Sequence, residues 1–193
     1  MAKLAKPCIL TGSCPGDLGE TEVLWFGEAK CVSKASAIVK LFGALEAAIV
    51  HVNLAAVKAE GRTRRILWLV LWALQYAGFY LSTGDGAYLA KAFKSLRKAV
   101  KLSYALASDA PLGWVVCLDE ICAYINAARA WVRWTERRLA QLDRGREVIT
   151  LLNHIGNVLF ELMRTRSHMV LTRQGATKYV PRLAQPEEGL LNF

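Results

Sequence analysis

The chain has 193 residues, enough for one compact domain, and a formal net charge of +9. Hydrophobic residues make up 54% and charged residues 21%, which excludes a disordered chain and allows a sizeable core. The five cysteines show no CxxC spacing, so neither a disulfide scaffold nor a zinc module is expected. Free thiols are typical of a reducing cytosol, and the composition predicts a basic, soluble, cytoplasmic protein that is largely helical.

The first 33 residues are rich in turn-forming residues and lack a sustained hydrophobic period, which predicts an extended, loop-like arm. From Lys34 the apolar residues recur at steps of three and four, which predicts a first helix with Ser33 as N-cap and Gly61 as its stop. The second helix begins near Arg64 and contains Ile66–Leu81, an apolar run of about 16 residues where a membrane span needs roughly 20. We therefore expect the central helix of a bundle and no membrane contact.

Three further helices follow. The third runs from about Ala87 to Ala107, and GWVVCL at 113–118 is a short apolar connector before a fourth helix that starts at Asp119 or Glu120. The inward positions repeat every three or four residues: Ile121, Ile125, Ala128, Val132, Thr135, Leu139 and Leu142 in the fourth helix, and Val148, Leu152, Ile155, Leu159 and Leu162 in a fifth helix after Gly145. From Val170 the period is lost, so an irregular tail is expected. The sequence predicts a single all-α domain, a five-helix up-and-down bundle: arm 1–33, bundle 34–168 and tail 169–193.

The fourth and fifth helices also carry polar stripes. One consists of Asn126, Arg129, Arg133 and Glu136, and the other of Asn153, Asn157, Phe160 and Arg164. Arg129 and Arg133 are like charges four residues apart, so a countercharge is expected, either a carboxylate from another helix or a bound polyphosphate. The alternative is a solvated face with ordinary salt bridges.

The arm contains Gly16-Asp17-Leu18-Gly19-Glu20-Thr21. Its glycines and hydroxyl group can present donors to phosphates, and its carboxylate can help to hold a cation. Alone, the same residues also fit a flexible turn.

In combination, these motifs resemble the PduO-type ATP:corrinoid adenosyltransferases. GDLGET resembles the family's TKxGDxGxT nucleotide loop, KCVSKASAIVKLFGALE is similar to its RVSKDxxRVEAYGxVDE, and LQYAGFYLST fits its LFDLGAxLAT. ARAWVRWTERRL and LLNHIGNVLFELMR are similar to its ARxxxRxAERxV and LNRLSDxLFxLAR helices. The blocks span most of residues 13–166. The resemblance implies a five-helix bundle that assembles as a homotrimer, with its site between subunits.

In that family a Co(I) corrinoid attacks C5′ of ATP and displaces tripolyphosphate, so the resemblance implies ATP, Mg²⁺ and cobalamin or another corrinoid as ligands. It places the ATP site at Gly16, Asp17, Gly19, Thr21, Lys34, Arg133, Glu136, Arg137 and Asn153. It also pairs Arg129 with Glu46, where the family has an aspartate, and Arg129, Arg133 and Glu46 form the catalytic set. The corrinoid candidates are Trp114, which stands nearest to the family's phenylalanine wall, and Phe160.

Several family residues are replaced. The lysine of TKxGD is Cys14, the aspartate of KD is Ala35, the RVE pair is Ile38 and Lys40, and the aspartate of the fifth helix is Asn157. One alternative is therefore a relative that binds nucleotide or corrinoid without transferring adenosyl. Another is a basic helical nucleic-acid-binding protein, because residues 129–182 carry 11 basic and 4 acidic side chains. The sequence shows no recognised nucleic-acid module, and several arginines fall on triphosphate positions, so the adenosyltransferase function is preferred.

Overall fold

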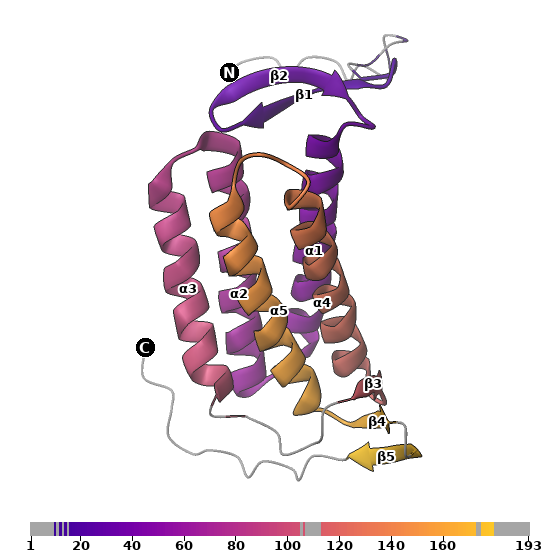
Figure 1. Cartoon of the computed structure of the whole chain (residues 1–193). Helices are drawn as coiled ribbons and strands as arrows, with labels where there is room; N and C mark the ends of the chain where they lie inside the picture. Colours follow the sequence, from indigo (N-terminus) through magenta and orange to yellow (C-terminus); the bar gives the residue numbers. More distant parts are fainter. Residues whose placement is uncertain are drawn as a thin grey trace.

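The computed structural model describes residues 10, 12, 14, 16–104, 106, 113–172 and 175–179. Its five helices run up and down in one bundle: α1 (Ala37–Lys58), α2 (Gly61–Thr83), α3 (Gly86–Tyr104), α4 (Glu120–Leu139) and α5 (Arg146–Arg164) (Figure 1). A hairpin of β1 (Glu20–Trp25) and β2 (Glu28–Ser33) covers one end of the bundle. At the other end lies an antiparallel sheet in the order β3 (Trp114–Cys117), β4 (His168–Thr172) and β5 (Gly175–Tyr179). The predicted five-helix bundle is confirmed.

The bundle core is formed by the apolar stripes that the sequence predicts. In α5 the five predicted inward residues are each at most 1% exposed: Val148, Leu152, Ile155, Leu159 and Leu162. In α4 the stripe is fully buried from Ile125 to Leu139, whereas Ile121 at its start is half-buried, as is Leu142, which lies beyond the end of the helix. α1 packs between α2 and α4, and α5 packs against α4 and α3. This order leaves α4 and α5 side by side, which brings their polar stripes next to each other.

Two helices, α1 and α2, are long and apolar enough to cross a membrane by length and composition. In this fold α2 packs against α1 and α3 and buries one face between Ile66 and Leu81. Trp68, Trp72 and Phe79 on the same helix are 39 to 49% exposed, so the helix is less completely buried than the sequence predicts.

The arm is more ordered than its composition predicts. β1 and β2 pair from Glu20 opposite Ser33 to Trp25 opposite Glu28, and both turn residues, Phe26 and Gly27, have a positive φ. The turn is fixed on the bundle because the N–H groups of Phe26 and Gly27 donate to carbonyls of α2, at 2.9 and 2.8 Å. The prediction of a loop-like arm is therefore wrong for residues 20–33. The hairpin was missed because its turn lacks the usual Asn-Gly or Asp-Gly signal and its strands carry several charged residues.

Two predicted helix ends also shift. Ser36, not Ser33, is the N-cap of α1, since its hydroxyl accepts the N–H of Val39 at 3.4 Å. Gly61 begins α2 and does not end α1, which stops at Lys58 with Ala59 as its C-cap. The predicted end of the third helix, Ala107, lies outside the described residues.

The connector and the start of the tail form strands where irregular segments were expected. Trp114 lies opposite Leu171 and Cys117 opposite His168, and β5 then pairs with β4. Strands of four and five residues are too short for their period to be read reliably from sequence. The small sheet closes the end of the bundle opposite the hairpin (Figure 1).

The expectation of free thiols is wrong. Cys117 and Cys122 form a disulfide with their Cα atoms 5.3 Å apart, and Cys14 is also disulfide-bonded. Among the described cysteines, Cys31 is free and exposed. The pair at 117 and 122 was overlooked because the two residues meet through the change of direction from β3 to α4, which no simple spacing rule encodes.

Candidate functional site

The polar stripes of α4 and α5 meet at Arg133. Its Nη1 donates to Asn153 Oδ1 at 2.9 Å and lies 2.9 Å from Glu136 Oε2. Gly156 of α5 lies beneath the same side chain, because a Cβ added there would be 3.4 Å from Arg133 Cδ. The two polar contacts both use Nη1 of a guanidinium that has five N–H donors, so the remaining donors can bind an anion. The structure therefore brings together three residues that were predicted to contact ATP.

Arg129 lies one turn before Arg133 and has a different environment. Its guanidinium carbon is 5.0 Å from the centre of the Phe160 ring, and Arg164 lies 5.7 Å from the same ring. Burial, and then the charge of Arg133, lowers the pKa of Arg129 below its ordinary value. Arg129 still lacks the carboxylate partner that the sequence predicts for it. Among the described residues, Glu46 forms no ion pair with Arg129.

Arg137 lies further along α4 and is exposed. Its guanidinium carbon is 5.1 Å from the centre of the Trp134 ring, and that of Arg138 is 4.6 Å away. Trp134 was missed at the sequence level because it stands outside both stripes. Arg137 is therefore near the group formed by Arg133, but it is positioned by an aromatic ring and not by Glu136 or Asn153.

The loop at residues 16–19 forms a tight turn in the arm. Gly16 and Gly19 have φ values of 91° and 83°, a conformation that glycine adopts without steric cost. The Gly19 N–H donates to the Gly16 carbonyl at 3.0 Å, and Asp17 Oδ2 accepts the N–H of Cys14 at 2.7 Å. Lys34 joins this loop: its N–H donates to the Gly19 carbonyl at 2.8 Å, and its Nζ would be 3.1 Å from a Cβ on Gly16. The loop and the lysine thus form one polar cluster.

Next to this cluster, a shallow groove runs between β1, α1 and α2. Its first part, about 370 Å³, is lined by both Thr21 and Glu46. A second part, about 460 Å³, continues along α1 and α2 and shares Phe42, Glu46 and Ser82 with the first. Glu46 is exposed in this groove. The structure therefore places Thr21 and Glu46 together, on the side of α1 that borders α2.

One chain consequently presents two separate half-sites. The arm half-site comprises the 16–21 loop, Lys34 and the groove with Glu46, and the stripe half-site is the α4–α5 surface around Arg129, Arg133 and Asn153. Among the described residues, no hydrogen bond or ion pair connects the two half-sites. Their separation follows from the order of the helices, since α1 packs between α2 and α4.

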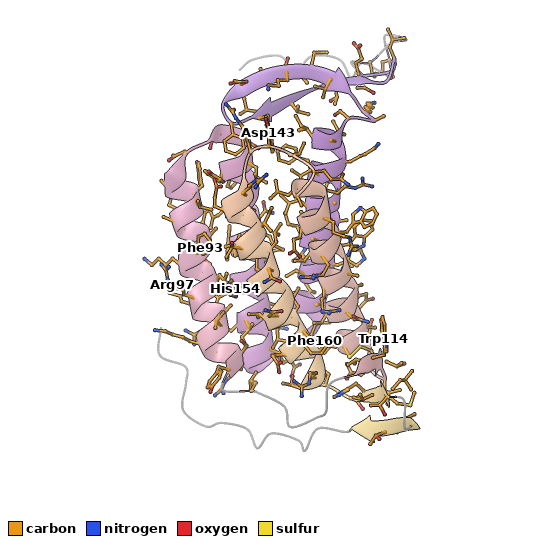
Figure 2. All side chains as sticks on the ribbon, in the orientation of Figure 1. Phe93, Arg97, Trp114, Asp143, His154 and Phe160 are labelled. Atoms are coloured by element: carbon orange, nitrogen blue, oxygen red, sulfur yellow. A yellow bond between two sulfur atoms is a disulfide. The ribbon has the colours of Figure 1, made fainter. Side chains whose placement is uncertain are left out.

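The two corrinoid candidates lie toward the β3–β5 end of the bundle, away from the hairpin (Figure 2). Trp114 starts β3 and is 83% exposed, so its indole is free to contact a ligand. Phe160 is half-buried beneath the two arginines that flank its ring. The Arg133 group, which consists of Arg133, Glu136 and Asn153, lies between these aromatic residues and the hairpin. Charged and aromatic side chains therefore follow one another along α4 and α5.

No group of three or more His, Cys, Asp or Glu residues that could hold a metal ion occurs in the described part of the chain. Mg²⁺ commonly needs one or two carboxylates together with phosphate oxygens and water. The carboxylate of Asp17, which is exposed in the loop, fits such a shared site.

Comparison with known proteins identifies the family. Residues 12–166 match the family model of cobalamin adenosyltransferases. Among solved structures, a variant of the PduO-type ATP:corrinoid adenosyltransferase from Lactobacillus reuteri in complex with cobalamin and ATP has a TM-score of 0.60 at 16% identity, covering 78% of this chain and 89% of that one.

A second variant of the same protein, also with cobalamin and ATP, has a TM-score of 0.62 at 17% identity over 78% of this chain and 87% of that one. A third, with ATP, has a TM-score of 0.59 at 16% identity over 78% and 90%. A search of curated protein sequences gives no match. The structures share the fold, and the family model covers most of the sequence: the chain belongs to the cobalamin adenosyltransferase family.

Proposed function

We propose that this protein transfers the 5′-deoxyadenosyl group of ATP to a Co(I) corrinoid and releases tripolyphosphate. The observation that carries the proposal is the Arg133 group, in which Glu136 and Asn153 hold a guanidinium on the polar face of α4 and α5. This face belongs to a fold and a family whose members perform that reaction. Its three residues stand at the positions that the family motifs give to the nucleotide.

The chemistry requires positioning and charge stabilisation more than proton transfer. Cobalt is the nucleophile, so a cobalt–carbon bond forms as the C5′–oxygen bond of ATP breaks, and no side chain has to act as a base. The leaving tripolyphosphate carries away the negative charge that develops. Arg133, Arg137 and Lys34 supply cations for it, and fixed donors of this kind are worth most where water is excluded.

ATP is proposed to bind with Mg²⁺, held by its own phosphates and by the loop. Asp17 would contribute a carboxylate oxygen to the cation, and the 16–19 turn would contribute backbone N–H groups to the phosphates. The family's lysine in this loop is Cys14 here, so we expect weaker phosphate binding than a loop with that lysine would give.

A complete site needs both half-sites, and we propose that a homotrimer supplies them from neighbouring chains. Glu46 lies exposed in the α1–α2 groove, whereas Arg129 lies on the α4–α5 side, so a pair between them requires a second copy. Apolar residues that a partner could cover are also exposed on these helices: Val50, Leu54 and Val57 on α1, Trp68, Trp72 and Phe79 on α2, and Trp131 and Trp134 on α4.

At the other end of the stripe, Trp114 and Phe160 are proposed to bound the corrinoid. An aromatic wall there would exclude the lower axial ligand of the cobalt, and four-coordinate cobalt is more easily reduced. We also propose a cytoplasmic location, where ATP is available.

A binding protein without transferase activity is the second candidate. It is favoured by the replacement of charged family residues, since Cys14, Ala35 and Asn157 leave fewer groups to hold ATP and its cation. Both candidates predict ligand binding, and they differ in whether the cobalt–carbon bond forms.

One experiment separates them. The protein is mixed anaerobically with Mg-ATP and chemically reduced cobalamin, and the visible spectrum is followed. We expect conversion to the spectrum of adenosylcobalamin, and loss of most of the rate in Arg133→Ala. Binding of both substrates without this spectral change would establish the second candidate, and absence of binding would exclude both.

A further inference from the structure

The strand that carries Trp114 is a short edge strand, and only Val115 and Cys117 in it are half-buried against the core. β3 has four residues, forms an edge of the three-stranded sheet, and buries none of its side chains fully. Its hydrogen-bonded neighbour is β4, itself a strand of five residues. A short edge strand with little buried surface belongs to the part of a fold that opens most easily.

The start of α4, by contrast, is well anchored. Asp119 is the N-cap and accepts the N–H of Cys122 at 2.8 Å, and its other carboxylate oxygen accepts the N–H of Ser167 at 3.0 Å. The N–H of Leu118 donates to the Ser167 carbonyl at 2.9 Å. Cys122 itself is fully buried in the bundle core. This end of α4 is therefore fixed whether or not β3 is attached to it.

The disulfide joins these two unequal elements. Cys117 is the last residue of β3, Cys122 lies in the first turn of α4, and the two are five residues apart. A bond that closes so short a loop constrains the unfolded chain less than one that closes a long loop, so its effect is mainly local. Its local consequence is to tie the strand of Trp114 to the helix of Arg129 and Arg133.

We propose that Cys117 and Cys122 are positioning residues for the corrinoid end of the site, and that their disulfide is a redox-sensitive restraint on Trp114. Intact, it holds β3 beside α4, so the indole keeps one place relative to Phe160. When it is cleaved, β3 is released and the corrinoid is bound less tightly, while the nucleotide end is unaffected. This inference rests on the proposed function, because it assigns a role to the corrinoid wall.

The chemistry of cleavage is ordinary thiol–disulfide exchange with a dithiol reductant. A thiolate of the dithiol attacks Cys117 Sγ, the more exposed of the two sulfurs, and the bond to Cys122 breaks. The departing Cys122 thiolate lies at the positively polarised N-terminus of α4, which favours its departure. The second thiol of the reductant then displaces Cys117 as a thiolate and closes a cyclic disulfide. In all, two electrons and two protons pass from the dithiol to Cys117 and Cys122.

The first test measures the restraint without using activity. Amide hydrogen exchange of residues 113–118 is compared in the oxidised wild type, in the wild type reduced by a phosphine, and in Cys117→Ser/Cys122→Ser. We expect at least tenfold faster exchange in both cleaved forms, with α5 unchanged. Cys31→Ser and Cys14→Ser, each assayed without reductant, are the controls and should leave β3 exchange as in the oxidised wild type.

The second test measures binding, with hydroxocobalamin by equilibrium dialysis and Mg-ATP by calorimetry, both without reductant. We expect the double serine variant to bind hydroxocobalamin at least fivefold more weakly than the oxidised wild type and to bind Mg-ATP equally well. Equal hydroxocobalamin affinity, or unchanged β3 exchange, would overturn the inference alone. If the oxidised wild type binds no cobalamin at all, the proposed function fails at its corrinoid end and the inference with it. If the double variant does not fold, the phosphine-reduced protein still decides the exchange measurement.

Discussion

The stripe half-site on α4 and α5 and the arm half-site at the hairpin end differ in what holds them in place. In the stripe, Arg133 is bound by Glu136 and Asn153, and Arg129 lies on Phe160, all from helices that form the core. In the arm, the loop is held by hydrogen bonds within the arm, from the backbone and from the Asp17 carboxylate, and the side chains of Asp17 and Lys34 are exposed. Helix packing therefore fixes the side chains of the stripe half-site before any ligand binds.

This difference predicts which half-site contributes more to the free energy of ATP binding. Side chains already fixed by neighbours lose little entropy when a ligand binds, whereas the long, exposed side chain of Lys34 must be ordered at that moment. The stripe is accordingly expected to dominate ATP affinity, and the arm to close over the phosphates from a neighbouring subunit.

The largest expected effect is on the molecular mass of the protein in solution. If each site combines the arm of one chain with the stripe of another, the protein in solution is a homotrimer of three 21.4 kDa chains. Light scattering at micromolar concentrations measures this directly. A monomer mass throughout that range would mean that the two half-sites do not meet, and the contrast would then describe two unrelated surfaces.

The second prediction concerns the contact itself. If Glu46 of one chain neutralises Arg129 of its neighbour, Glu46→Gln or Arg129→Gln leaves an uncompensated charge and costs on the order of 3 kcal/mol when the pair is fully desolvated. The double change should cost less than the sum of the two, as measured by thermal unfolding. Additive losses would show that the residues do not meet.

A surface pair provides the control for that cycle. Arg144 lies 3.7 Å from Glu28, and both side chains are about half exposed. Arg144→Gln should change stability by less than about 1 kcal/mol, because exposed ion pairs contribute little.

The third prediction tests the stripe half-site. Arg133→Ala should weaken Mg-ATP binding by roughly 2 kcal/mol, about 30-fold, which is the scale of a charge-assisted hydrogen bond. Helix content should stay the same, because Arg133 lies outside the buried seam of α4. Arg97→Ala, on the outer face of α3 (Figure 2), is the matched control and should bind as the wild type does. Calorimetry that found equal affinity in Arg133→Ala would move the nucleotide site elsewhere.

The same contrast governs what the sequence could predict. The seam from Ile125 to Leu139 and the opposing stripes follow from helical spacing, because a regular helix converts sequence position directly into direction. The meeting of Arg133 with Asn153 was within reach for that reason. Gly156, which lets Arg133 lie across α5, was not singled out, since a glycine in a helix shows no period.

Features that depend on changes of chain direction were out of reach. The hairpin turn at Phe26 and Gly27 is fixed by carbonyls of α2, which are far away in the sequence. The disulfide between Cys117 and Cys122 depends on the strand-to-helix turn at 118–119. The pairing of Glu46 with Arg129 stays a prediction, because the geometry of one chain separates the two residues.

The smallest expected effect tests the arm half-site, through the conformation of its loop. Gly19 is the suitable position: it has a φ of 83°, and a Cβ there would meet no atom within 4 Å, whereas a Cβ at Gly16 would also displace Lys34. Gly19→Ala therefore changes backbone preference alone, at a cost of about 1 kcal/mol for a left-handed alanine. We expect Mg-ATP affinity to fall about fivefold by calorimetry. Gly86→Ala, which also faces open space but lacks a positive φ, is the control and should leave affinity unchanged. Equal affinity in Gly19→Ala would mean that ATP is held by the stripe without this turn, and the proposed role of the loop in binding phosphates would be withdrawn.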